Sequence, residues 1–85
     1  MKYKYIGTEA QLIENGFRPY HDTNYDCITS YHKPCKRVDN EIMVAWNNNC
    51  CFDKREIGYR YGFDNLNIND IQGLIDKGLV EVIGE

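Results

Sequence analysis

The sequence predicts an α+β domain, in which two short helices, one near each terminus, accompany a small antiparallel β-sheet of about four to six strands. A similar phrase occurs near both ends of the chain, at 8–17 and at 69–79. Each copy has a capping residue, a Gln, a Leu-Ile pair, an acid and a glycine followed by a large apolar residue. Between the copies, alternating and aromatic-rich segments are separated by turn residues, a pattern typical of antiparallel hairpins. Because the chain has 85 residues, we expect 1–85 to form a single domain.

The first part of the chain predicts a strand followed by a short helix. Residues 2–6 alternate in the way that a half-buried strand does. Thr8 is a good N-cap for the helix, and Gly16 can adopt the left-handed conformation that ends one. A helix of about two turns is not stable alone. It must therefore dock on a sheet, and we expect Leu12 and Ile13 to form its buried stripe.

The middle of the chain predicts a series of hairpin strands. Residues 25–31 are rich in strand formers, and 33–37 have the composition of a basic loop. Segment 41–46 is the strongest strand candidate. Its apolar residues fall on both faces, which predicts a central position in the sheet and a core position for Trp46. Segment 57–63 also alternates, which places on one face Ile57, Tyr59, Tyr61 and Phe63.

The last part of the chain predicts a second helix and a final strand. Asn69 is the expected N-cap and Gly78 the expected end of this helix, and its buried residues are expected to be Ile71, Leu74 and Ile75. We expect a positive φ at Gly16 and at Gly78. Residues 79–83 form the last strand, which we place beside the first. The repeated phrase fits either an internal duplication or convergence on one helix-to-strand connection.

Composition excludes several classes of function. The net charge is −3, so no global basic field is present to hold a phosphate backbone. No apolar run approaches the roughly 18 residues that a membrane-spanning helix needs, and the first residues do not resemble a signal peptide. A cytoplasmic location is therefore expected. No glycine-rich phosphate loop occurs, and a small domain leaves little room for a deep active site, so we predict neither catalysis nor a bound cofactor.

The four cysteines allow a zinc-binding alternative. Cys27, His32, Cys35 and Cys50 include one closely spaced pair, His32-x-x-Cys35, and could form a structural zinc module. Zinc sites are usually built from two such pairs. We therefore predict no bound metal, and in a reducing compartment no obligatory disulfide.

Tyrosine is the other residue type in excess, with seven in the chain. Tyrosine and arginine supply much of the binding energy at protein interfaces. We therefore predict that the protein binds a protein partner through an exposed part of its tyrosine-rich sheet or through the adjoining loops. The candidate binding residues are Tyr31, Arg37, Arg55, Tyr59, Arg60 and Tyr61.

The same residues permit a nucleic-acid alternative, since aromatic rings stack on bases and basic groups contact phosphates. Asp26, Asp53 and Glu56 balance these basic residues within a short distance in the sequence, so an ordinary solvated sheet face explains the charges more simply than a nucleic-acid site does. Segment 70–82 resembles the last helix and first wing strand of winged-helix domains, a resemblance that implies nucleic-acid binding. A small-ligand binder is a further alternative.

The two ends of the chain, 1–17 and 71–83, are similar to small accessory proteins of bacteriophages and prophages. The resemblance implies a small, non-enzymatic protein in the cytoplasm of a bacterial host. It also implies stoichiometric binding to one host protein, including inhibition of a defence nuclease such as those of CRISPR systems. The middle of the chain has no counterpart in this resemblance, so no binding residue is transferred. The sequence indicates neither the identity of the partner nor the oligomeric state.

Overall fold

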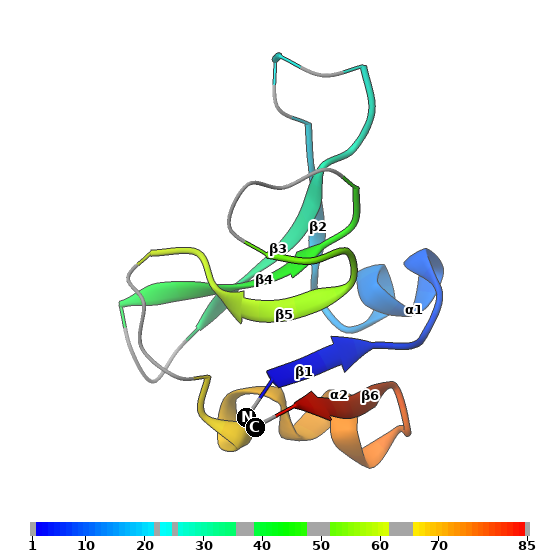
Figure 1. Ribbon diagram of the computed structural model, residues 1–85, viewed down its shortest axis with the longest axis vertical. Helices are drawn as coiled ribbons and strands as arrows, with labels where there is room; N and C mark the ends of the chain where they lie inside the picture. The colour runs from blue at the N-terminus through cyan, green and yellow to red at the C-terminus, as the bar shows by residue number, and fades with distance from the viewer. Residues whose placement is uncertain are drawn as a thin grey trace.

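Six antiparallel strands form one sheet in the spatial order β2-β3-β4-β5-β1-β6. The computed structural model describes residues 2–21, 23–24, 26–35, 39–47, 52–61 and 66–84. Figure 1 shows its elements, which are β1 (Lys2–Tyr5), α1 (Glu9–Glu14), β2 (Arg18–Tyr20), β3 (Ser30–Cys35), β4 (Asn40–Ala45), β5 (Glu56–Tyr59), the 3₁₀ helix η1 (Ile68–Ile71), α2 (Gln72–Asp76) and β6 (Val80–Gly84). The predicted α+β class is confirmed, with α1 and α2 near the two ends of the chain.

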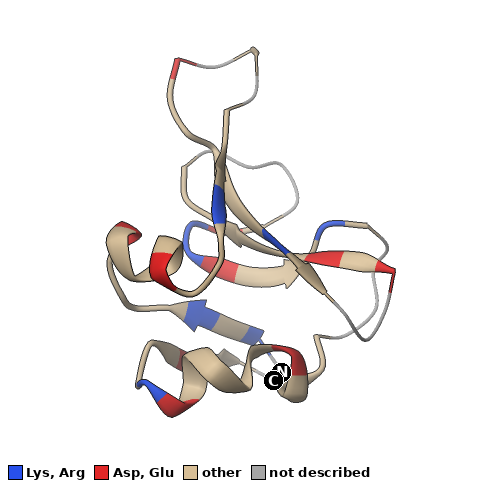
Figure 2. Cartoon of the chain, turned by 180° about the vertical axis from the view of Figure 1, so that it is seen from behind, with Lys and Arg blue, Asp and Glu red and all other residues tan. Residues whose placement is uncertain are grey.

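The first and last strands lie side by side, as predicted. β1 pairs with β6 in the register Tyr3↔Val82 and Lys4↔Glu81. β1 also pairs with β5, so it joins the central hairpins to the last strand. The two ends of the chain consequently lie next to each other, which is visible from both sides in Figure 1 and Figure 2.

The first helix begins and ends where the sequence predicted. The Thr8 hydroxyl accepts a hydrogen bond from the Gln11 N–H at 3.2 Å, and the Thr8 N–H donates to Gln11 Oε1 at 2.9 Å, which completes a capping box. Gly16 has a φ of 92°. The predicted stripe is only half correct, because Leu12 is fully buried whereas Ile13 is 56% exposed. A helix of six residues turns too few side chains toward the sheet to bury both.

The helical segment near the C-terminus begins earlier than predicted, although α2 itself begins only at Gln72. This helix is preceded by η1, whose N-cap is Asn67, and the Asn67 side chain accepts from the Asn69 N–H at 2.9 Å. Asn69 is therefore inside the helical segment and is not the cap. Gly78 has the expected positive φ, 72°. The expected buried residues are Ile71 and Leu74, which are buried, and Ile75, which is partly buried against the core.

Strand β3 begins later and extends further than predicted. The predicted strand at 25–31 begins only at Ser30, and the segment predicted as a basic loop continues the strand through Cys35, paired with β4. Pro34 does not interrupt it. β2 pairs with β3 only as far as His32. Pro34 lies beyond this pairing, so β2 needs no hydrogen bond from the N–H that proline lacks. Of the predicted loop, residues 36–37 lie outside the described residues.

The central strand is β4, as predicted, flanked by β3 and β5. Trp46, which directly follows β4, is 9% exposed and belongs to the core. The alternating segment at 57–63 is shorter than expected. β5 ends at Tyr59, Tyr61 lies beyond it and is 58% exposed, and Phe63 lies outside the described residues.

One face of the sheet packs with both helices to form the core. Its buried members are Tyr3, Tyr5, Leu12, Phe17, Tyr31, Ile42, Val44, Trp46, Ile57, Tyr59, Ile71, Leu74 and Leu79. We call this side the core face and the other side the helix-free face. Of the helices in the described chain, none is long and apolar enough to cross a membrane.

Candidate functional site

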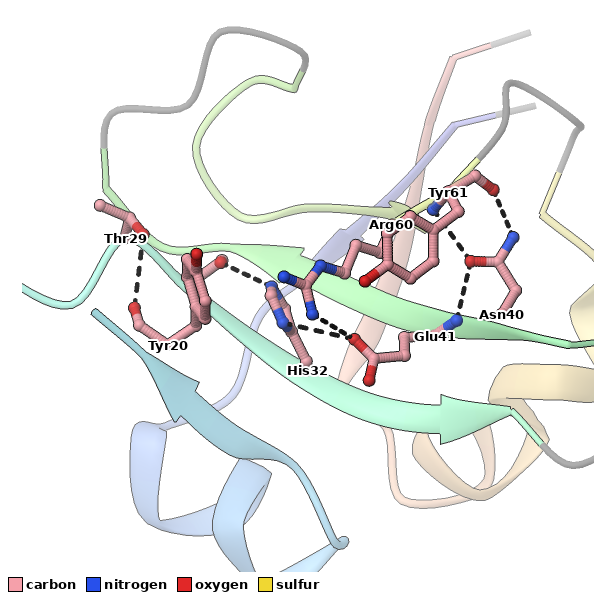
Figure 3. Close-up of polar contacts among 8 residues, drawn as sticks. Tyr20, Thr29, His32, Asn40, Glu41, Arg60 and Tyr61 are labelled. Carbon is pink, nitrogen blue, oxygen red and sulfur yellow. Dashed lines mark hydrogen bonds and ion pairs between the residues drawn. The ribbon is translucent and has the colours of Figure 1, made fainter. Parts of the chain in front are cut away.

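The helix-free face carries a cluster of aromatic and charged side chains near one end of the sheet, shown in Figure 3. We name it the Arg60 cluster and define it as Tyr20, His32, Glu41, Arg60 and Tyr61. Strand alternation explains its place. Successive side chains of a strand point to opposite faces. Because Tyr31, Ile42 and Tyr59 lie in the core, the side chains next to them, those of His32, Glu41 and Arg60, lie on the other face. Tyr61 lies beyond the end of β5, so alternation does not account for its place, which its backbone contacts with Asn40 determine.

The centre of the cluster is the Arg60 guanidinium. Its Cζ lies 5.0 Å from the ring centroid of Tyr20 and 5.0 Å from that of Tyr61. Both distances are within the range of cation–π attraction. Arg60 Nη1 donates to Glu41 Oε1 at 2.8 Å. The cation is therefore held between two rings and one carboxylate.

His32 packs beside this arrangement. Its imidazole stacks on the Tyr20 ring with a centroid distance of 4.9 Å. His32 Nδ1 lies 3.6 Å from the same Glu41 oxygen that Arg60 bonds. Burial lowers the pKa of His32, the positive charge of Arg60 lowers it further, and Glu41 acts in the opposite direction. The hydrogen bond to Glu41 raises the pKa of Arg60. At neutral pH the cluster is thus a paired cation and anion beside an uncharged imidazole.

Backbone contacts hold both rings in position. The Asn40 side-chain oxygen accepts from the N–H of Tyr61 at 2.9 Å and from that of Glu41 at 2.8 Å, and its amide donates to the Tyr61 carbonyl. The Arg60 N–H donates to the Glu41 carbonyl at 2.8 Å. At the other side, the Thr29 N–H donates to the Tyr20 carbonyl at 3.0 Å. The two residues after β5 are therefore fixed to β4, and Tyr20 is fixed to the start of β3.

The contacts around His32 also bear on catalysis. Ser30 Oγ lies 2.8 Å from His32 Nε2, so Ser30, His32 and Glu41 follow the order of nucleophile, base and acid. However, Ser30 is only 2% exposed, and Glu41 is closer to Arg60 than to His32. A substrate has no access to a hydroxyl buried to this degree. We interpret the Ser30 contact as one that orients the imidazole.

Of the five predicted binding residues that the structure describes, it brings two together, Arg60 and Tyr61. Tyr31 and Tyr59 are 2% and 7% exposed and lie in the core, so they are not part of a surface. Arg55 lies over the Trp46 ring, with Cζ 3.6 Å from its centroid, and is only partly exposed. Arg37 lies outside the described residues.

Sequence reasoning missed three members of the cluster: Tyr20, His32 and Glu41. For His32 and Glu41 the sequence held a signal of their place on the helix-free face, because each is adjacent in a strand to a residue that is buried. Using that signal requires knowledge of which face is buried, and the sequence around Tyr31 does not reveal it. Tyr20 carried no signal beyond its place after a proline.

The described part of the zinc alternative does not assemble. His32 and Cys35 both lie on β3, three positions apart, so their side chains point to opposite faces. Cys35 packs against the core, whereas His32 belongs to the Arg60 cluster. Cys27 is exposed, and Cys50 lies outside the described residues. Within the described ranges, no three His, Cys, Asp or Glu side chains form a group that could hold a metal ion.

Comparison with protein families, with curated proteins and with solved structures gave no match for this chain. The Arg60 cluster therefore has to be interpreted from its own geometry. What it offers is a preorganised surface of two exposed rings, 39% exposed at Tyr20 and 58% at Tyr61, around a partly exposed cation.

Proposed function

We propose that this protein acts by stoichiometric, non-catalytic binding to another protein, with the Arg60 cluster at the centre of the contact. The observation that carries the proposal is the Arg60 guanidinium held between the Tyr20 and Tyr61 rings. Tyrosine and arginine are the residue types enriched at the energetic centres of protein interfaces. Side chains that are already positioned lose less conformational entropy when a partner binds.

Charge favours a protein partner over a nucleic acid. Arg60 already bonds Glu41 at 2.8 Å, so a phosphate would have to compete with that carboxylate. Figure 2 shows acidic and basic positions interleaved along the described chain. The net charge of −3 adds a weak general repulsion of polyanions.

The class of partner comes from the resemblance of the two ends of the chain to phage accessory proteins. On that basis we propose a bacterial host protein in the cytoplasm as the target, with a defence nuclease as one candidate. The proposed action is occupation of a surface that the host protein needs. The Arg60 cluster is where such a contact would concentrate its binding energy.

Affinity purification with matched variants tests the proposal. The tagged protein is incubated with nuclease-treated bacterial lysate, and captured proteins are identified and their affinities measured. Arg60→Ala and Tyr61→Ala should each weaken the specific complex by roughly 30-fold, the equivalent of about 2 kcal/mol. The control is Ile13→Ala. Ile13 is 56% exposed, close to the 58% of Tyr61, but it lies on α1. Its effect should be less than about twofold.

Two results would contradict the proposal. One is a specific complex whose affinity is the same for wild type and for Arg60→Ala. The other is binding to random single-stranded or duplex DNA that weakens steeply with salt and is lost in Arg60→Ala, since phosphate contacts carry a strong salt dependence.

A further inference from the structure

His32 and Arg60 face the same carboxylate oxygen within the Arg60 cluster. Arg60 Nη1 lies 2.8 Å from Glu41 Oε1, and His32 Nδ1 lies 3.6 Å from the same oxygen. The guanidinium is always protonated, whereas a neutral imidazole carries one proton on its two ring nitrogens. The protonation state of His32 therefore decides how many cations compete for this carboxylate.

The imidazole is held in the orientation that a second proton needs. His32 Nε2 lies 2.8 Å from Ser30 Oγ, and its ring stacks on the Tyr20 ring. The contact between the His32 ring and Glu41 is visible in Figure 3. In the imidazolium both nitrogens are donors, so Nε2 donates to the Ser30 hydroxyl oxygen and Nδ1 is directed at Glu41. Protonation therefore adds a donor toward Glu41 without turning the ring.

The surroundings of His32 carry more positive than negative charge. The charged or titratable groups that face it in the described chain are Arg18 and Tyr20 from β2, Glu41 from β4 and Arg60 after β5. Arg18 lies opposite His32 in the register of β2 and β3, and opposite residues of an antiparallel pair share one face. A protonated His32 is thus a third cation beside one carboxylate. The Arg60 side chain is 29% exposed and that of His32 is 10% exposed, so Arg60 has more room to move away.

We propose that His32 is a pH switch of the Arg60 cluster: its protonation draws Glu41 away from Arg60 and releases the guanidinium from between the Tyr20 and Tyr61 rings. The consequence for binding rests on the proposed function, since a cluster that is no longer preorganised binds the partner less tightly. The protein then holds its partner at neutral pH and releases it in acid. Burial and the charge of Arg60 lower the pKa of His32, so the transition lies below about pH 6.5.

Thermodynamic linkage gives the size of the effect. A partner that binds only the form with a neutral His32 displaces one proton from each protein molecule that was protonated there. The dissociation constant then increases by up to about tenfold for each pH unit below the His32 pKa. By reciprocity, the bound partner lowers the pKa of His32 further.

NMR titration of the free protein tests the switch without a partner, from about pH 8 to about pH 4.5, where histidine titrates. Tyr20 stacks on His32, whereas Tyr61 contacts Arg60, so the Tyr61 ring signals report on Arg60. They should shift with the same midpoint as His32. This transition should disappear in His32→Gln and remain in the control His21→Gln, which changes the other, exposed histidine. Tyr61 signals that do not respond at the His32 midpoint in the wild type would overturn the proposal.

The complex obtained by affinity purification tests the consequence for binding. Between neutral pH and one pH unit below the His32 midpoint, its dissociation constant should increase about tenfold for the wild type and for His21→Gln. For His32→Gln the increase should be less than about twofold. Equal pH dependence in the wild type and in His32→Gln would overturn the regulatory inference and leave the proposed function in place. A complex that is insensitive to Arg60→Ala would overturn the proposed function, and the NMR titration would still decide whether the switch exists.

Discussion

The two faces of the sheet use tyrosines and carboxylates in opposite ways. On the core face, the Tyr31 hydroxyl donates to Glu9 of α1 and the Tyr59 hydroxyl donates to Asp70 of η1. Each ring fills the core while its hydroxyl ties a helical segment to the sheet. On the helix-free face, the rings of Tyr20 and Tyr61 flank a cation and remain exposed (Figure 3).

The difference shows that strand register, more than residue type, determines the role of a tyrosine in this protein. Tyr31 and His32 are adjacent in β3, and Tyr59 and Arg60 are adjacent at the end of β5, yet each pair is divided between the two faces. On the core face, tyrosine contributes to stability. On the helix-free face, it stays exposed beside Arg60, where we propose that a partner binds.

The most direct test of this comparison changes the same residue type on both faces. Tyr31→Ala should lower the free energy of unfolding by about 3–5 kcal/mol, because it leaves a cavity beside Trp46, whose ring centroid lies 5.4 Å away. Tyr20→Ala should cost less than about 1 kcal/mol, since its ring is largely solvated and loses mainly the Arg60 contact. Urea unfolding of both variants decides the matter. Equal losses would argue against a functional division between the faces.

Alkaline pH should weaken the core face. Burial and the hydrogen bond to Glu9 raise the pKa of Tyr31 to about 12, above its unfolded value near 10. The unfolded chain therefore releases this proton first. The stability that the protonated hydroxyl provides is complete below about pH 10 and decreases as the pH rises toward 12, by up to about 3 kcal/mol.

Tyr31→Phe isolates this contribution. The phenylalanine variant lacks the titrating group, so its stability should fall less steeply than that of the wild type between about pH 10 and pH 12. Thermal unfolding across this range measures the difference. Identical slopes would mean that the Tyr31 hydroxyl ionises as easily in the folded protein as in the unfolded chain.

Local signals in the sequence predicted the parts of the fold that depend on local chemistry. Thr8 caps α1 through its own side chain, and both Gly16 and Gly78 adopt the positive φ that ends a helix. The apolar content on both faces of β4 predicted its central place correctly. The pairing of the two end strands followed from the similarity of the two helix-to-strand connections.

The errors arose where tertiary contacts decide the outcome. Pro34 and its charged neighbours indicate a loop, but β2 is too short to need an N–H at this position. Ile13 fits an apolar stripe, but the helix buries only Leu12. Tyr31 and Tyr59 were expected at the surface and are buried. Predicting their burial requires knowing which face of each strand meets the helices, and the local sequence does not indicate this.

The helix-free face also has a closely packed part, at Gly58. A Cβ placed on Gly58 would lie 2.4 Å and 2.6 Å from two atoms of the Phe52 ring. Gly58→Ala should therefore cost about 1–2 kcal/mol, from overpacking. The double variant with Phe52→Ala should be less destabilised than the sum of the two single variants, because the clash is removed. Additive losses in urea unfolding would place the Phe52 ring elsewhere.

Acidic pH should lower the free energy of unfolding through the helix-free face, whereas alkaline pH lowers it through the core face. Of the four tests, this one should show the smallest effect. Burial and the charge of Arg60 lower the pKa of His32 in the folded protein. As the pH falls below about 6.5, the unfolded chain gains a proton that the folded protein resists. The stability that depends on the neutral imidazole is complete above that pH and decreases below it.

Two variants test this effect. His32→Gln retains a polar group beside Ser30 and should make the loss of stability with falling pH less steep in thermal unfolding. Arg60→Ala should shift the titration of His32, followed by NMR, toward higher pH. A His32 pKa that rises in the folded protein would show that Glu41 outweighs both burial and Arg60, and the cluster would then gain stability from acid.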